Sequence, residues 1–251
     1  MTTALRTADA EVSAGPALLT VDGLAVSYGA ARVLDGVSFT ARAGRLLAFL
    51  GANGSGKSTT LRAVAGLIGH DGGTIEFASG TDRPAMVFQK IHLVARRSVL
   101  DNVCAGALHR IPLARSLHPW LFPAEIRREA MAALDRVGLA DRADQRAGTL
   151  SGGQQQRVAV ARALCQGAPV VLADEPVAAL DPKAARSIMA LLRELAHEEN
   201  LAVAAVLHQP DLALEYADHV IGLQSGRIVL DAPAEAVDLD QIGELYAEVA
   251  R

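Results

Sequence analysis

Residues 51–58, GANGSGKS, place three glycines, a lysine and two serines where an apolar run gives way to a helical pattern. The run RLLAFL predicts a buried strand and KSTTLRAVAGLI predicts a helix, so the glycines occupy the turn between them. Glycines let successive backbone N–H groups turn inward around a polyphosphate, where a Cβ atom would obstruct it. The helix start adds unpaired N–H groups and a positive dipole end. The segment predicts a phosphate-binding loop, with a chance match in a glycine-rich turn as the alternative.

Two side chains of this loop carry specific chemistry. Lys57 can reach the outer phosphates of a nucleotide, and the Ser58 hydroxyl can serve a magnesium ion. The loop residues that we expect to bind the nucleotide are Gly51, Asn53, Gly54, Ser55, Gly56, Lys57, Ser58 and Thr59. Binding alone hydrolyses nothing, so hydrolysis requires further groups elsewhere in the chain.

The segment VVLADEP supplies two carboxylates, Asp174 and Glu175, at the end of a predicted buried strand. Adjacent carboxylates repel each other, and a divalent cation relieves that repulsion. Because side chains alternate along a strand, the two point in different directions. We expect Asp174 to serve the magnesium ion and Glu175 to orient or deprotonate a water. An acidic pair that merely precedes a helix at Pro176 is the alternative.

The segment LSGGQQQRVAVARAL predicts a second helix start suited to phosphate. Ser151 suits the N-cap, Gly152 and Gly153 open the helix, and its apolar residues repeat at helical spacing. One explanation is a composite site, made by the loop of one chain and this helix start of another. A well-capped structural helix is the alternative.

Composition places the chain among ordinary globular proteins. The 251 residues are 51% hydrophobic and 21% charged, and the net charge of -4 gives no nucleic-acid footprint. No run of 18 apolar residues predicts a membrane span, and the N-terminus lacks a signal pattern. Cys104 and Cys165 fit small buried hydrophobes. We expect a soluble or peripheral protein of the cytoplasm.

The order of apolar patterns predicts an α/β protein with a mainly parallel sheet. Residues 18–40 predict antiparallel strands, and GTIEFA, PAMVFQ, PVVLA and LAVAAVL predict further strands. Residues 90–148 predict a mostly helical insert, within which PAEIRREAMAALDRVGL is a helix. A helix from Gln154, a helix over residues 183–197 and the hairpin HVIGLQSGRIVL follow. Strands alternating with helices indicate helices on both faces of a parallel sheet.

With LSGGQ between the phosphate loop and VVLADE, the chain resembles the ATP-binding cassette (ABC) ATPases over residues 18–232. The resemblance implies a P-loop NTPase (RecA-like) core, an N-terminal antiparallel β subdomain and a helical insert subdomain at about residues 90–150. Residues 1–17 would form a flexible N-terminal segment, and residues 233–251 a C-terminal tail.

The resemblance also assigns roles to residues that carry little signal alone. Tyr28 would stack on adenine, although alone it reads as a strand residue facing the core. Gln89 would sense the magnesium ion and water, Asp181 would contact the partner subunit, and His208 would contact the γ-phosphate. In isolation these three read as a strand-end polar residue, a helix cap and a structural histidine. Pro210 departs from the family pattern, and we expect it to stiffen a loop after His208.

The resemblance thus implies ATP and Mg²⁺ as cofactors. The catalytic residues would be Glu175, His208, Lys57 and Gln89, and the metal ligands Ser58, Gln89 and Asp174. The remaining nucleotide contacts would come from Tyr28, Ser151, Gly152, Gly153, Gln154 and Asp181, in part across a head-to-tail dimer.

Finer segments, among them MVFQKIHLVARRSVLDNV and LHQPDLALEYADHVIGLQSGRIVLD, resemble the ATP-binding subunit of phosphonate importers. The resemblance implies ATP hydrolysis that energises uptake of phosphonates, or of phosphite or phosphate. The partners would be a second copy of the chain, two transmembrane permease subunits and, indirectly, a periplasmic solute-binding protein, with no nucleic acid. The location would be peripheral, at the cytoplasmic face of the inner membrane.

Other functions stay open at this point. An importer ATPase for another small solute would look similar. A soluble ABC ATPase of DNA repair or translation usually shows tandem cassettes or coiled-coil insertions, which this chain lacks. A small-molecule phosphotransferase would use the phosphate loop but would need neither LSGGQ nor a dimer.

Overall fold

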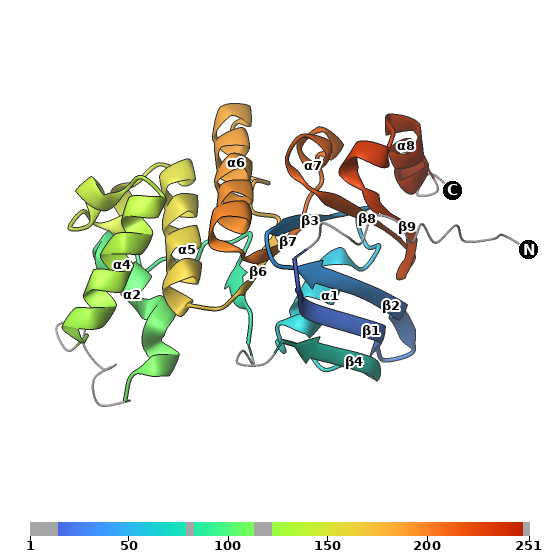
Figure 1. Ribbon diagram of the computed structural model, residues 1–251, viewed down its shortest axis with the longest axis horizontal. Coiled ribbons are helices and arrows are strands. Elements are labelled where there is room, and N and C mark those ends of the chain that lie inside the picture. The colour runs from blue at the N-terminus through green and yellow to red at the C-terminus, as the bar shows by residue number, and fades with distance from the viewer. Residues whose placement is uncertain (1–14, 79–82, 113–121, 248–251) are drawn as a thin grey trace, which may run out of the picture.

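A computed structural model describes residues 15–78, 83–112 and 122–247 of the chain (Figure 1). The first 14 residues, most of the segment expected to be flexible, lie outside the described part. The strands are β1 (Ala17–Tyr28), β2 (Ala31–Arg42), β3 (Arg45–Leu50), β4 (Gly72–Phe77), β5 (Ala85–Val87), β6 (Val170–Asp174), β7 (Ala202–Val206), β8 (His219–Gln224) and β9 (Arg227–Pro233). The α-helices are α1 (Lys57–Val64), α2 (Val99–Cys104), α4 (Ala124–Arg136), α5 (Gly152–Gln166), α6 (Pro182–Glu199), α7 (Pro210–Tyr216) and α8 (Leu239–Ala247).

The strands form two sheets, as the sequence predicts. The smaller sheet is antiparallel, in the order β2-β1-β4, and the larger has the order β5-β6-β7-β3-β8-β9. In the larger sheet β5, β6, β7, β3 and β8 run parallel, and β9 joins β8 as an antiparallel hairpin. The chain is therefore an α/β protein with a mainly parallel sheet and an N-terminal antiparallel sheet.

The parallel sheet is covered on both faces, so its central strands are uniformly apolar. Every residue of β6 and β7 is buried. Alternate residues of β3 pack into two different hydrophobic cores, one on each face of the parallel sheet. Leu47 packs toward the antiparallel sheet, and Leu46 packs toward α6 and the helical region formed by α2, α4 and α5. The rings of Phe39 and Phe49 meet edge to face, with centroids 5.0 Å apart, and join the two sheets.

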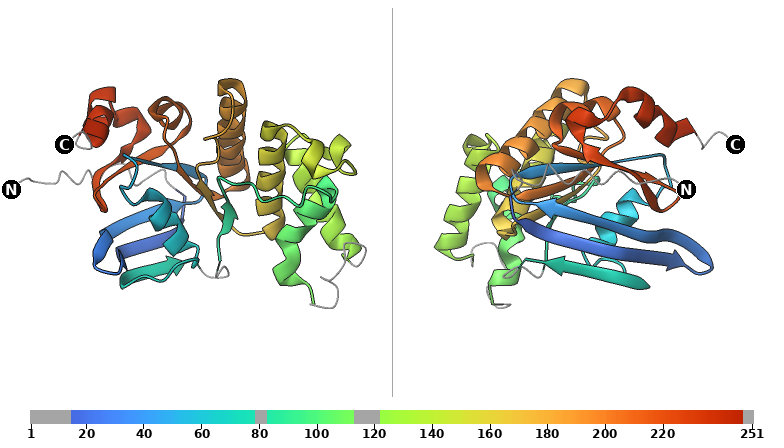
Figure 2. Two further views of the ribbon diagram at one scale, coloured as in Figure 1. Left: turned by 180° about the vertical axis from the view of Figure 1, so that it is seen from behind. Right: turned by 45° about the vertical axis from the view of Figure 1, so that its right-hand side comes forward.

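The helices α2, α4 and α5 gather at one end of the molecule, away from the antiparallel sheet, as the views in Figure 1 and Figure 2 show. The helix predicted within residues 123–139 is present as α4, which ends at Arg136 before Gly138 with its φ of 70°. Arg136 of α4 contacts three carboxylates of α6, at 3.4 Å (Glu194), 3.1 Å (Glu198) and 2.7 Å (Glu199). These ion pairs tie the helical region to the sheet domain.

Two predictions for individual elements are wrong. The helix after the phosphate loop ends at Val64 and not at Ile68, because Gly66 takes a φ of 68° just after its C-cap. Pro210 does not stiffen a loop but begins α7. Proline fits the first turn of a helix because backbone N–H groups there have no acceptor within the helix, so none is lost. Among the described residues, no helix is long and apolar enough to cross a membrane.

Candidate functional site

The loop of residues 51–58 joins β3 to α1 and depends on two of its glycines for close backbone approach. A Cβ atom on Gly51 would lie 2.1 Å from the carbonyl oxygen of Leu223, and one on Gly56 would lie 2.5 Å from Leu34. Both glycines also have positive φ, at 141° and 107°. Larger residues would therefore push the loop away from β8 and β2.

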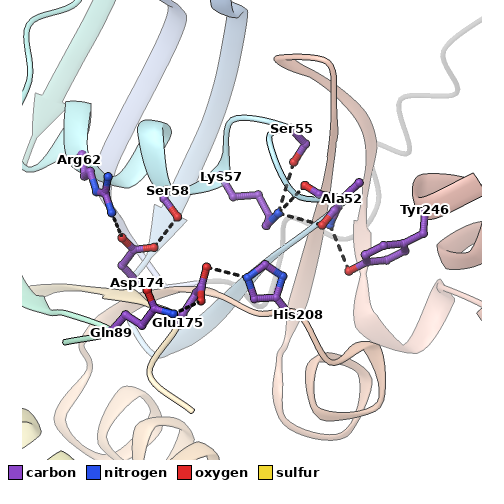
Figure 3. A network of polar contacts seen from close by, with 11 residues as sticks. Ala52, Ser55, Lys57, Ser58, Arg62, Gln89, Asp174, Glu175, His208 and Tyr246 are labelled. Atoms are coloured by element: carbon purple, nitrogen blue, oxygen red, sulfur yellow. Dashed lines mark hydrogen bonds and ion pairs between the residues drawn. The ribbon is translucent and has the colours of Figure 1, made fainter. Parts of the chain in front are cut away.

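Lys57 folds back over this loop. Its Nζ donates to the carbonyl oxygens of Gly51 and Ala52, both at 2.8 Å, and lies 3.4 Å from the Ser55 hydroxyl (Figure 3). Burial lowers the pKa of Lys57, while the charges of Glu175 and Asp174 oppose that change. The loop thus holds a buried ammonium group at its centre, where phosphate oxygens of a nucleotide would be attracted.

Asp174 ends β6 beside the start of α1. The Ser58 hydroxyl donates to its Oδ1 at 2.6 Å, and the guanidinium of Arg62 contacts its Oδ2 at 3.2 Å. Only 3% of Asp174 is exposed, so its charge needs these partners. Arg62 was missed by sequence reasoning, although its spacing of four residues from Ser58 puts both on one face of a helix.

Glu175, the next residue, points to a different set of partners. Its Oε2 accepts from the Gln89 amide at 2.7 Å, and its Oε1 lies 2.6 Å from Nε2 of His208. Figure 3 shows the two carboxylates facing apart, Asp174 toward α1 and Glu175 toward Gln89 and His208. Glu175 has a positive φ of 52°, which is unusual for a residue other than glycine. The two side chains diverge as expected, but strand alternation is not the reason, because β6 ends at Asp174 and Glu175 has a left-handed backbone conformation.

Gln89 and His208 reach this site from the strands on either side of β6. Gln89 follows β5 and His208 follows β7, and both strands pair with β6. The carboxyl ends of parallel strands share one edge of a sheet, and ligands of open α/β sheets bind there. The structure thus brings together Lys57, Ser58, Gln89, Asp174, Glu175 and His208 from four segments of the chain.

The other predicted site residues lie apart from this cluster. Ser151 caps α5 in a capping box with Gln154, and Asp181 caps α6 by accepting from the N–H of Ala184. The two helix starts adjoin each other, since a Cβ atom on Gly153 would lie 3.3 Å from that of Ala184. In Figure 1, α5 and α1 lie on opposite sides of β6. These residues form a second, exposed cluster.

Tyr28 also lies outside the central cluster. The alternative that it faces the core is wrong, because 54% of the residue is exposed at the end of β1. An exposed aromatic ring can stack on a flat ligand, which an interior ring cannot do.

The donor set around Ser58 and Asp174 fits a magnesium ion. Mg²⁺ prefers oxygen ligands, usually one or two carboxylates with waters and substrate phosphates. A hydroxyl and a carboxylate meet here, 2.6 Å apart, at the end of the phosphate-binding loop. Within the described ranges, no group of three or more His, Cys, Asp or Glu residues could form an all-protein cage. The residues therefore suit a metal that arrives with a nucleotide.

A family profile for the ABC transporter matches residues 34–178. A relative from Frankia casuarinae, named Phosphonates import ATP-binding protein PhnC, is 49% identical over 236 residues, covering 88% of this chain and 92% of its own length. A relative from Mycolicibacterium smegmatis, named Phosphate-import ATP-binding protein PhnC, is 47% identical and covers 88% of this chain and 89% of its own length.

The chain is also similar to a solved structure that is a dimer. The dimeric structure of a bacterial ABC transporter cassette superposes with a TM-score of 0.72 at 27% identity, covering 88% of this chain and 100% of that chain. The family match includes the phosphate-binding loop, the α5 start and both carboxylates, and it ends before His208.

Proposed function

The chain belongs to the ABC transporter ATPases, and from this premise we propose that it hydrolyses ATP to energise import of phosphonates or related phosphorus oxyanions. The observation that carries the catalytic part is the cluster of Lys57, Ser58, Gln89, Asp174, Glu175 and His208 at one sheet edge. The identity of the imported solute is inferred from the names of the relatives, one of which is named for phosphonate import and the other for phosphate import. Phosphate is therefore the second candidate solute.

The nucleotide would bind along the loop of residues 51–58. Backbone N–H groups of the loop and the start of α1 would donate to phosphate oxygens. Lys57 would exchange its contacts with Gly51 and Ala52 for contacts with the outer phosphates. A magnesium ion held near Ser58 and Asp174 would supply neutralisation of phosphate charge. Tyr28, which is exposed at the end of β1, would stack on the adenine ring.

Hydrolysis requires a water in line with the bond between the β- and γ-phosphates. Glu175 would accept a hydrogen bond from this water and receive its proton as the oxygen attacks the γ-phosphorus, and the bond to ADP breaks. Gln89 and His208 both contact Glu175 and so hold its carboxylate in place. His208 would then turn to the γ-phosphate. The reaction depends mainly on positioning and electrostatics.

A second copy of the chain would complete the site. The α5 start, with Ser151, Gly152, Gly153 and Gln154, is a helix N-terminus suited to phosphate, and Figure 1 shows α5 away from α1 of its own chain. In a head-to-tail dimer it would cover the nucleotide bound by the partner, and Asp181 beside it would contact that partner. The dimeric cassette among the similar structures supports such a pair.

The membrane subunits would dock on a hollow of about 470 Å³ between the sheet domain and the helical region. Its walls come from the residues that follow α1, the segment from Pro84 to His92, the start of the 3-10 helix after α2, and α5. The exposed apolar residues Leu67 and Val94 lie on the same segments or beside them. Such a groove suits the apolar face of a helix. This docking would place the chain at the cytoplasmic face of the membrane.

The solute is tested by growth of the host after deletion of the coding sequence. Cultures receive a phosphonate, phosphite or phosphate as the sole phosphorus source. Loss of growth on phosphonates alone, restored by the wild-type chain but not by Glu175→Gln, supports phosphonate import. Loss on phosphate alone supports the second candidate. Unchanged growth on all three in a host without a redundant system contradicts both.

A further inference from the structure

The C-terminal helix α8 reaches the first residue of the phosphate-binding loop. The N–H of Gly51 donates to the hydroxyl of Tyr246 at 3.4 Å, across 195 positions of the chain (Figure 3). Burial raises the pKa of this hydroxyl, so it keeps its proton at neutral pH and accepts through a lone pair. A residue of the C-terminal tail thereby contacts the nucleotide site from outside it.

Apolar packing fixes α8 where this contact is made. Ile242 and Leu245 are buried, with 2% and 4% exposed. Gly222 of β8 makes room for the helix, since a Cβ atom there would lie 2.8 Å from both methyl groups of Leu245. Gly222 pairs with Leu50, the last residue of β3, so the docked helix lies beside the point where the loop begins.

Gly51 connects this helix to the lysine of the loop. Its N–H is bound by Tyr246, and its carbonyl oxygen accepts from Lys57 at 2.8 Å. The glycine has no side chain to restrict its φ of 141°, so its orientation depends on such contacts. On its other side, the loop is held by the β8–β9 turn, where the N–H of Gly226 donates to the backbone carbonyl oxygen of Ser55 at 3.0 Å. Tyr246 and Gly226 thus hold the loop at two points.

We propose that Tyr246 is a positioning residue for the phosphate-binding loop, and that docking of α8 sets the affinity of the chain for ATP. The hydroxyl holds Gly51 so that the loop is ordered before the nucleotide arrives, which lowers the entropic cost of binding. The inference rests on the ATP-binding part of the proposed function and not on the solute. It gives the C-terminal tail a role as a control point for nucleotide binding.

The hydroxyl can be separated from the packing of its helix. Tyr246→Phe keeps the ring and removes only the oxygen. We expect the Kd of the full chain for ATP with Mg²⁺ to rise about two- to fivefold, because one long hydrogen bond between neutral groups is lost. KM should rise by the same factor while kcat stays unchanged. A purely structural tyrosine would lower the melting temperature without changing Kd.

A second variant and a control make the test specific. Leu245→Ala keeps the Tyr246 hydroxyl but weakens the packing of α8 on β8. The Kd for ATP should therefore rise, as in Tyr246→Phe. Tyr216→Phe, in α7, removes a hydroxyl away from the loop and should leave Kd unchanged. Wild-type affinity in Tyr246→Phe would overturn the inference, whatever its melting temperature. A wild-type chain that binds no ATP would overturn the proposed function as well, so the two failures are distinguishable.

Discussion

The carboxylate of Glu175 lies 2.6 Å from the imidazole of His208, while its other oxygen accepts from Gln89 at 2.7 Å. These side chains come from the ends of three neighbouring strands, β6, β7 and β5. The carboxylate proposed to activate water is thus held from both sides by side chains of its own chain.

Glu175→Gln should abolish hydrolysis and keep ATP binding. The amide has nearly the shape of the carboxylate but cannot accept the proton, so kcat should fall by about 10²- to 10⁴-fold. Phosphate release and equilibrium nucleotide binding measure the two effects separately. Residual turnover near the wild-type rate would show that another group activates the water.

Lys57→Ala should weaken nucleotide binding itself. The variant loses an ammonium group that would donate charged hydrogen bonds to phosphate, each worth roughly 1.5–3 kcal/mol, so Kd for ATP should rise about tenfold or more. Lys183→Ala removes an exposed lysine of α6 and serves as the control in dilute, monomeric protein. Equal affinities for all three proteins would exclude the loop as the phosphate site.

Ser58→Ala should raise the Mg²⁺ concentration that gives half-maximal hydrolysis. Asp174 would lose its contact at 2.6 Å, and the metal would lose one oxygen ligand. Ser58→Thr keeps the hydroxyl and should retain the wild-type requirement. The assignment is contradicted if the alanine and threonine variants show the same magnesium dependence.

The two cysteines should be inert in the folded chain. Burial raises the pKa of Cys104 to about 12 and that of Cys165 to about 11, so both stay protonated at neutral pH. Alkylating reagents should modify them only after unfolding. Because the folded pKa values exceed the reference value of 9.0, the stability they contribute is complete below about pH 9 and is lost as pH rises toward 11–12. Rapid alkylation at pH 8 in native protein would contradict this.

Local patterns in the sequence were enough to predict most of the fold and four residues of the central cluster, Lys57, Ser58, Asp174 and Glu175, whereas Gln89 and His208 were assigned by resemblance. The strand-turn-helix around Lys57 and the strand that ends at Asp174 have strong short-range signals, and parallel strands bring their ends to one edge. The exposure of Tyr28 could not be predicted, because the edge of the antiparallel sheet depends on how the sheets pack. The helix at Pro210 was missed because proline suits both loops and helix starts.

The residues that sequence reasoning missed contact partners far away in the sequence. Arg62 contacts Asp174 across 112 positions, and Tyr246 contacts Gly51 across 195. Only the helical spacing from Ser58 to Arg62 could have suggested the first pair. No local period links the C-terminal tail to the phosphate-binding loop, so the second pair emerges only from the packing of α8 on β8.

The central claim, a site shared by two chains, is tested most directly by the mass of Glu175→Gln in sedimentation experiments with saturating ATP and Mg²⁺. The account predicts a dimer with ATP and a monomer without it, because blocked hydrolysis prevents reopening. Adding Ser151→Arg to this variant should abolish the dimer and keep ATP binding, whereas adding Glu125→Arg, on the exposed face of α4, should not. A monomer at saturating ATP, or a dimer unaffected by Ser151→Arg, would contradict the composite site.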